Sequence, residues 1–398
     1  MDVAKPVRAD ALFEVLERAV TESNPLYTQA SSTRLQMLSP ESKFLAISTR
    51  LTEVCRMVSK LSHPPFHDST GNPNMSRRHF LQNAAAALPA AVWPFSSVPA
   101  APASEPRYRL ALGQWTFNRA FRGVEGVTRR DSLEFPTMAG ELGFEGVDYS
   151  GILLGEHHAN PKSLAELNRR AADAGVKNVL ILVDLHDALG AKDAAARQAN
   201  AEKFRPWLDA AATLECIGVR VNPISDDSLP ADEQAQLLAD GITRLLKFSV
   251  PMKLDVLIEN HGEGLRTDGA WLASVAKQVA DPHCGTLPDF GNFQKNRATG
   301  EYHDRYAGVA AMLPFAKCVC AKSLDFDANG DECYSDYGKL LRQVADSGYR
   351  GWIEVEYEGP GTATPERKPA GQLSETEGCL ATKRLLEKLL GADLAKKQ

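Results

Sequence analysis

Short apolar runs alternate with amphipathic stretches from residue 108 onwards. The eight runs, rich in Val, Ile, Leu and aromatic residues, cover 108–116, 143–149, 177–184, 216–222, 254–261, 285–290, 317–323 and 351–357. The stretches between them place Leu and Ala at helical spacing, as in 163–175 and 337–348, and Gly175 and Gly348 stand where a helix C-cap is expected. Eight strand–helix units match a (β/α)8 barrel, and no G-x-G-x-x-G follows an early run as the alternative, an open doubly wound sheet, would favour. The pattern predicts an α/β fold, a single-domain TIM barrel over 104–398.

Polar residues recur at the C-terminal ends of these runs. They are Asp148, Asp184, Asn222, Glu259, Asp289, Lys322 and Glu356, and neighbours in this series are separated by 30 to 38 residues. Because a barrel gathers the C-terminal ends of its strands at one rim, where active sites are built, we expect the set to converge. For Asp148 alone we expect a solvated loop residue or a helix N-cap.

Two of these carboxylates end apolar runs. Residues 254–261 read LDVLIENH, which places Glu259 and His261 on one face of a strand. A buried carboxylate needs a partner, either a divalent metal or a basic side chain, because an unpaired buried charge is costly. In 285–292, GTLPDFGN, Asp289 ends the run and is either a site residue or part of an Asx-type turn.

The last run carries three glutamates, Glu354, Glu356 and Glu358, on one face of a strand. Three like charges do not share one dry pocket, so we expect Glu356 to reach the centre of the rim and the other two to be wetter or paired. Carboxylate oxygens suit Mg²⁺ or Mn²⁺, and a histidine ligand would extend the choice to Zn²⁺ or Co²⁺.

Four motifs in order resemble those of one family. The segments ENHG (259–262), LPDFGN (287–292), AKSLDFD (321–327) and GYRGWIEVEYEG (348–359) resemble the xylose isomerase-like barrels, and within them the sugar phosphate isomerase/epimerase branch. The resemblance implies one divalent metal ion (Mn²⁺, Mg²⁺, Co²⁺ or Zn²⁺) bound by Glu259, Asp289 and Glu356. It also implies that Glu259 and Glu356 transfer protons on opposite faces of a sugar.

The sequence departs from this family on the seventh run. Where the family often has H-x-K, this chain has Cys320, Ala321 and Lys322. Cys320 is then either a thiolate ligand of a soft metal or a small buried residue. The candidates for substrate contact are His261, Asn292, Lys322, Arg220 and Trp115. Trp115 either stacks on a sugar ring or packs in the core.

The segment 75–103 resembles a secretory signal. Ser76 to Leu81 read SRRHFL, which matches the twin-arginine pattern, and Ala101-Pro102-Ala103 supplies a cleavage site. The apolar part is too short and too interrupted by proline for a stable membrane span. We therefore predict a periplasmic protein exported by the twin-arginine machinery. Residues 1–74 are either upstream of the true start at Met75 or a real helical extension.

The net charge and the predicted export limit the partners and substrates that fit this chain. The formal charge of −6 weighs against nucleic acid as a partner. Sugar phosphates are scarce outside the cytoplasm, so the resemblance implies a metal-dependent isomerase or epimerase of a non-phosphorylated sugar or related polyol. The alternatives are a dehydratase or lyase of a keto-sugar or inosose, and a carbohydrate-binding barrel without turnover. The sequence is compatible with an oligomer.

Overall fold

Eight parallel strands surround a central axis in the computed structural model, which describes residues 107–359 and 373–393. They are β1 (Tyr108–Gly113), β2 (Gly146–Ser150), β3 (Lys177–Val183), β4 (Gly218–Val221), β5 (Asp255–Glu259), β6 (Cys284–Leu287), β9 (Val319–Ser323) and β10 (Gly351–Tyr357). Each of the eight predicted runs contains one of these strands or most of it. The sheet order is β6-β5-β4-β3-β2-β1-β10-β9, and parallel bridges Thr286↔Ala316 and Asp289↔Cys320 bring its two ends together. The predicted TIM barrel is confirmed.

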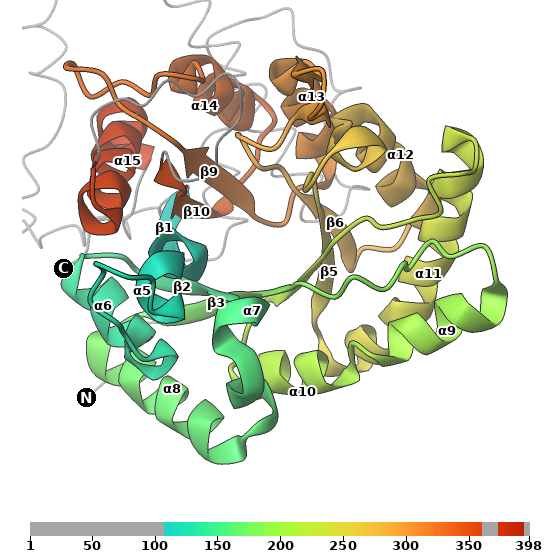
Figure 1. Cartoon of the computed structure of the whole chain (residues 1–398), viewed down its shortest axis with the longest axis horizontal. Coiled ribbons are helices and arrows are strands. Elements are labelled where there is room, and N and C mark those ends of the chain that lie inside the picture. Colours follow the sequence, from blue (N-terminus) through green and yellow to red (C-terminus); the bar gives the residue numbers. More distant parts are fainter. Residues whose placement is uncertain (1–106, 360–372, 394–398) are drawn as a thin grey trace, which may run out of the picture. The chain divides into compact units, whose positions relative to one another are not determined.

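Helices follow the strands and form an outer ring, in chain order, around the sheet (Figure 1). Their bounds are α5 (Asn118–Arg122), α6 (Phe135–Glu141), α7 (Gly151–Leu154), α8 (Pro161–Ala174), α9 (Ala194–Glu202), α10 (Arg205–Thr213), α11 (Ala231–Ser249), α12 (Gly269–Val279), α13 (Arg305–Met312), α14 (Tyr337–Asp346) and α15 (Glu375–Leu390). The side chain of Asn160 caps the N-terminus of α8, and Gly175 ends it at a φ of 65°, as its sequence pattern predicts.

Two apolar layers hold the barrel together. The larger one packs the strands against the helices, and it includes large buried side chains such as Phe135, Phe204 and Phe293. A smaller cluster of eight residues, among them Leu257 and Leu287, makes a separate buried group. Burying such side chains contributes about 1.5–3 kcal/mol each. The polar strand ends are thereby carried on a rigid support.

Two short elements after the strands matter for the site. A 3₁₀ helix, η2 (Gln114–Phe117), follows β1 and carries Trp115. An antiparallel hairpin of β7 (Gln294–Asn296) and β8 (Glu301–Tyr302) follows β6, and the apolar pattern does not predict it, because its strands are short and polar.

The predicted signal at 75–103 and the extension 1–74 lie outside the described residues. None of the helices within residues 107–359 and 373–393 has both the length and the apolar character that a membrane span requires.

Candidate functional site

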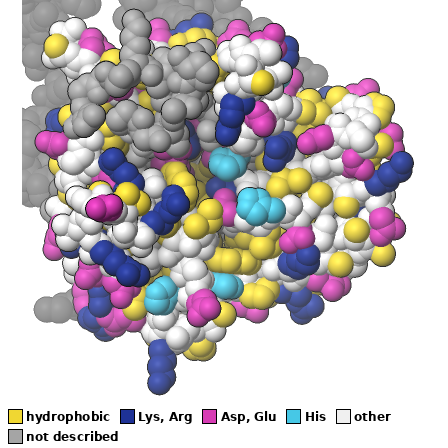
Figure 2. Space-filling model, in the orientation of Figure 1, with side chains coloured by type: hydrophobic (Ala, Val, Ile, Leu, Met, Phe, Trp, Pro, Cys, Tyr) yellow, Lys and Arg dark blue, Asp and Glu magenta, His cyan; other side chains and the backbone are white. Residues whose placement is uncertain are grey.

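A cavity of about 260 Å³ opens at the C-terminal ends of the strands. Eight sequence-predicted rim or site residues line it: Trp115, Asp184, Arg220, Glu259, His261, Asn292, Lys322 and Glu356. The rim at which these strands end therefore brings together side chains from distant parts of the chain, as barrel topology requires. Figure 2 shows hydrophobic, charged and histidine side chains next to one another around the hollow in the middle of this face.

Lys322 and Glu356 form a buried ion pair on the cavity wall. Strand pairing sets them side by side on β9 and β10, and Lys322 Nζ lies 2.6 Å from Glu356 Oε1. The same ammonium is 3.6 Å from Asp289 Oδ2 and 3.6 Å from Glu358 Oε2. One cation thus faces three carboxylates.

Burial and charge act in opposite directions on this pair. Burial disfavours the charge on Lys322, but the carboxylates of Glu356, Glu358 and Asp289 outweigh it and raise its pKa well above the usual value. Lys322 therefore remains an ammonium group and is not a nucleophile. Burial raises the pKa of Glu356 to about 7, although the Lys322 charge opposes this shift. A carboxyl group with such a pKa exchanges protons near neutral pH.

Arg220 connects two further carboxylates at the rim. Its Nε lies 2.7 Å from Glu259 Oε2, and its Nη1 lies 2.8 Å from Asp184 Oδ1. Nη1 also donates a hydrogen bond to Asn222 Oδ1 at 2.9 Å. Burial disfavours the guanidinium charge, but the two carboxylates outweigh it and raise the pKa of Arg220. The basic partner that the sequence left open for Glu259 is thus Arg220.

Asp289 is positioned by the turn that follows β6. Its Oδ1 accepts hydrogen bonds from the backbone N–H groups of Gly291 (2.6 Å) and Asn292 (2.8 Å), which is the Asx-type turn. Asn260 holds the turn from the neighbouring strand, because its Oδ1 accepts the Asp289 N–H at 2.8 Å and its Nδ2 donates to the Asp289 carbonyl at 2.9 Å. Asp289 Oδ2 is buried and makes no hydrogen bond.

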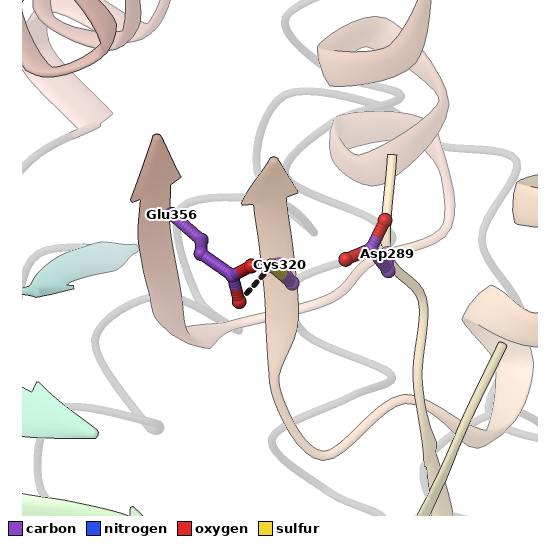
Figure 3. Close-up of side chains that lie close together, drawn as sticks. All are labelled: Asp289, Cys320 and Glu356. Carbon is purple, nitrogen blue, oxygen red and sulfur yellow. Dashed lines mark hydrogen bonds between the residues drawn. The ribbon is translucent and has the colours of Figure 1, made fainter. Parts of the chain in front are cut away.

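Asp289, Cys320 and Glu356 can each offer a ligand atom, and these atoms lie within 4.8 Å of one another (Figure 3). Cys320 Sγ is 4.0 Å from Glu356 Oε2, and all three residues are buried. The set fits a divalent cation, because two carboxylates and one sulfur are ligands that such ions accept. Asp289 Oδ2 also makes no hydrogen bond, although the Lys322 ammonium lies 3.6 Å from it. Glu259, which the resemblance implies as a ligand together with Asp289 and Glu356, lies outside this group and pairs with Arg220.

The uncharged candidates line the same cavity. Burial lowers the pKa of His261 to about 3, and the neighbouring charges of Arg220 and Lys322 act in the same direction. His261 is therefore neutral at physiological pH and can donate or accept a hydrogen bond. Asn292 lines the same cavity, and partly buried Trp115 lines it on the side of β1.

The expectation for Asp148 is wrong. It has no exposed surface, and its neighbour Glu354 is also fully buried. Burial raises the pKa of both carboxyl groups, that of Asp148 to about 8, so this pair retains protons at neutral pH. Gly113 makes room for it, because a Cβ there would lie 2.3 Å from Glu354 Oε1.

Sequence reasoning also missed residues on loops. The hairpin contributes Arg297 and Tyr302 to the lining, and the ends of two later loops contribute Arg305 and Tyr334. These residues do not belong to the two-residue alternation of the predicted strands, so that pattern does not indicate them. Only their aromatic or basic character, close after a predicted strand end, could have indicated them.

Solved structures with the same fold include sugar epimerases. A D-psicose 3-epimerase, solved in the presence of D-fructose, has a TM-score of 0.53 and 14% identity, covering 71% of this chain and 99% of that one. A D-psicose 3-epimerase with D-tagatose from Clostridium cellulolyticum H10 has a TM-score of 0.52 and 11% identity, covering 71% and 99%. The IOLI protein with a bound zinc atom has a TM-score of 0.54 and 14% identity, covering 72% and 100%. At these identities the likeness shows the fold alone.

The sequence is also similar to one curated protein and to one protein family. A curated relative from Microbacterium sp, the 3'-dehydrocarminate deglycosidase alpha subunit, is 40% identical over 57 residues, which is 14% of this chain and 16% of that protein. The family described as "Xylose isomerase-like TIM barrel" matches residues 137–377, more than half of the chain. The protein therefore belongs to the xylose isomerase-like TIM barrel family.

Proposed function

We propose that the protein isomerises or epimerises a non-phosphorylated sugar or related polyol by moving a proton on a carbon next to a carbonyl group. The observation that carries this proposal is the contact between Glu356 and Lys322 on the cavity wall, which sets a proton acceptor beside a permanent positive charge. Removing a proton next to a carbonyl leaves negative charge on the carbonyl oxygen. A base and a cation side by side on the wall of one cavity are the groups that such a reaction needs.

In this proposal Glu356 takes the proton and Lys322 stabilises the charge that develops. The C–H electron pair shifts to form a carbon–carbon double bond, the carbonyl pair moves to oxygen, and the Lys322 ammonium donates a hydrogen bond to that oxygen. Isomerisation is complete when the proton of the adjacent hydroxyl group passes to the former carbonyl oxygen and Glu356 returns its proton to the former carbonyl carbon, so that the new carbonyl forms on the adjacent carbon. Neutral His261 and Asn292 supply further hydrogen bonds to hydroxyl groups.

Epimerisation at a single carbon needs a second acid on the opposite face of the sugar. Glu259 lines the same cavity from β5, with its Oε2 2.7 Å from Arg220 Nε. It is the carboxyl group that we assign to the opposite face.

Asp289, Cys320 and Glu356 are the residues that would hold a divalent cation. Such a cation supplies Lewis-acid polarisation of the substrate's carbonyl and hydroxyl oxygens when bound. The thiol of Cys320 is the feature that sets the ion type, because sulfur favours Zn²⁺ or Co²⁺ over Mg²⁺. Burial raises the pKa of this thiol well above its usual value, so Cys320 is protonated until a cation is bound.

The choice of a non-phosphorylated substrate depends on export. We propose that the SRRHFL motif at 76–81 directs the chain to the periplasm, where sugar phosphates are scarce. The N-terminal sequence of the native protein tests this: a start near Ser104 supports export and cleavage, and an intact Met1 contradicts it.

A second candidate is elimination from a keto-sugar, and the resemblance to a 3'-dehydrocarminate deglycosidase subunit favours it. Its first step is the same. Where the carbon next but one to the carbonyl carries a leaving group, loss of the proton to Glu356 breaks the C–O bond, a C=C bond forms, and the leaving oxygen takes a proton from Glu259 or water. Both candidates therefore predict proton exchange catalysed by Glu356.

The experiment is to incubate the full-length chain, loaded in turn with Zn²⁺, Co²⁺, Mn²⁺ and Mg²⁺, with ketoses, inososes and 3-keto-glucosides in D₂O. Deuterium on the carbon next to the carbonyl in at least one of them is the expected result. A new epimer or isomer supports the first candidate, and an unsaturated product supports the second. Binding of these compounds with neither deuterium uptake nor an unsaturated product would contradict both and identify a carbohydrate-binding barrel.

A further inference from the structure

The cavity has one apolar wall and one charged wall. From β1 to the end of β3 its lining consists of the apolar Trp115, Ile152 and Leu182 and of two polar residues, Ser150 and Asp184. The Asp184 carboxylate pairs with Arg220 on the neighbouring strand. From β4 onward the strand ends contribute charged groups, of which Arg220, Glu259, Lys322 and Glu356 are described above. Most charged groups of the lining therefore follow β4 or a later strand, and that part also contains Leu324 and two tyrosines.

Ile152 is the most prominent member of the apolar wall. Its side chain is 55% exposed, the largest value among the four exposed large hydrophobic residues in the described part of the chain. The other three, Val124, Met252 and Leu389, do not line the cavity. An exposed isoleucine at the mouth of a reactive site leaves apolar surface in water that a ligand can cover.

The wall is held in place by its surroundings. Helix α7 carries Ile152, and the preceding Gly151 packs so closely that a Cβ there would lie 2.8 Å from the Leu182 carbonyl oxygen. Ser132 Oγ donates a 2.6 Å hydrogen bond to the Leu153 carbonyl on the same helix. A preformed apolar surface binds an apolar group without an added ordering cost.

We propose that the substrate is a glycoside with an apolar, aromatic aglycone. The aglycone lies against Trp115, Ile152 and Leu182, while the sugar ring faces Glu356 and Lys322. A sugar's hydroxyl groups match the charged wall and gain little from the apolar one, whereas an aromatic ring has the opposite preference. This inference rests on the proposed function for the position of the sugar.

The inference also limits the reaction. In a glycoside the anomeric carbon is locked by its bond to the aglycone, so the carbonyl group must be on another ring carbon. Epimerisation or elimination next to that carbonyl then replaces aldose–ketose isomerisation.

Calorimetric titration of the full-length chain with methyl and phenyl β-glycosides of D-glucose, D-galactose and D-xylose tests the apolar wall. The wild type should bind the phenyl member of at least one pair about tenfold more tightly than the methyl member. Ile152→Ser should remove most of that advantage and leave methyl glycoside affinity unchanged. The matched control is Leu389→Ser, which removes an aliphatic side chain that is 40% exposed and distant from the lining, and it should behave as the wild type.

Equal affinity for the two members of every pair, or a phenyl advantage that survives Ile152→Ser, overturns the inference. Failure of all six compounds to bind overturns it as well. The proposed function is judged separately by deuterium uptake. Exchange without a phenyl advantage refutes the aglycone alone, and a phenyl advantage without exchange refutes the chemistry alone.

Discussion

Lys322 Nζ lies 2.6 Å from Glu356 Oε1, and the two residues face each other across neighbouring strands β9 and β10. Their side chains are 5% and 4% exposed, so the pair is almost completely removed from solvent. Each group depends on the other, because an unpaired charge at this depth loses its hydration without compensation. The base and the cation of the proposed reaction are therefore also a structural unit of the barrel rim.

Replacing Lys322 by Met should destabilise the fold by about 3–5 kcal/mol, because Glu356 and Asp289 lose their common cation. Urea denaturation followed by circular dichroism measures this change. The double variant Lys322→Met/Glu356→Gln should recover a large part of the loss, since it leaves one fewer unpaired carboxylate. Equal stability of the single variant and the wild type would show that the pair is not a structural unit.

Replacing Cys320 by Ser should weaken zinc and cobalt binding by about tenfold or more, because the soft sulfur ligand is lost while the size is kept. The absorption spectrum of the cobalt-loaded protein should lose its sulfur-to-cobalt charge-transfer band. Cys318→Ser is the matched control, because Cys318 is equally buried and lies outside the three-residue group. An unchanged spectrum in Cys320→Ser contradicts a role for this sulfur as a ligand.

The Asp148–Glu354 pair predicts how stability depends on pH. Asp148 has a pKa of about 8 when folded and 3.8 as its ordinary value, so between these limits the folded state keeps a proton that the unfolded chain releases. The free energy of unfolding should therefore fall as pH rises through this window, by at most about 1.4 kcal/mol per pH unit for this group.

Asp148→Asn should make that slope shallower and raise stability at the alkaline end, while Glu354 preserves part of it. Thermal unfolding across the window gives the slope. Asp173→Asn, at a side chain that is 64% exposed, is the control and should keep the wild-type slope. A slope unaffected by Asp148→Asn would mean that Asp148 is ionised in the folded barrel.

Arg220→Met should destabilise the protein by about 3 kcal/mol or more, because Asp184 and Glu259 both lose their partner. The stability of Arg220→Lys should lie between those of Arg220→Met and the wild type. A lysine ammonium group keeps the charge but cannot reach both carboxylates in the same geometry. Urea denaturation measures both variants. Weaker substrate binding with unchanged stability would instead assign Arg220 to the substrate.

The strands were predictable because each is a short apolar run bounded by polar or turn-forming residues. Residues 351–357 were placed correctly, and alternation correctly put Glu354, Glu356 and Glu358 on one face. Alternation does not predict how deeply each of these side chains is buried. Pairing with β9 sets Glu354 beside Cys320 and Glu356 beside Lys322, and this register places one glutamate in the barrel interior and the next on the cavity wall.

Partners across the barrel were harder to predict. Glu259 was expected to need a cation, and the sequence offered a metal or a basic residue; only the folded barrel brings Arg220 from β4 to within 2.7 Å. Asp148 was expected in a solvated loop or at a helix N-cap, yet β2 carries it inside the barrel. The cavity residues on the hairpin after β6 belong to loops, where no period guides a prediction.

The most direct test of the central claim is deuterium uptake by Glu356→Gln. On the compound that the wild type exchanges in D₂O, this variant should be slower by at least about 100-fold, because glutamine cannot accept the proton. Glu387→Gln, a surface control whose side chain is 51% exposed, should exchange at the wild-type rate. Thermal unfolding and substrate titration of Glu356→Gln establish that it is folded and binds. Exchange at the wild-type rate by folded Glu356→Gln would contradict the account.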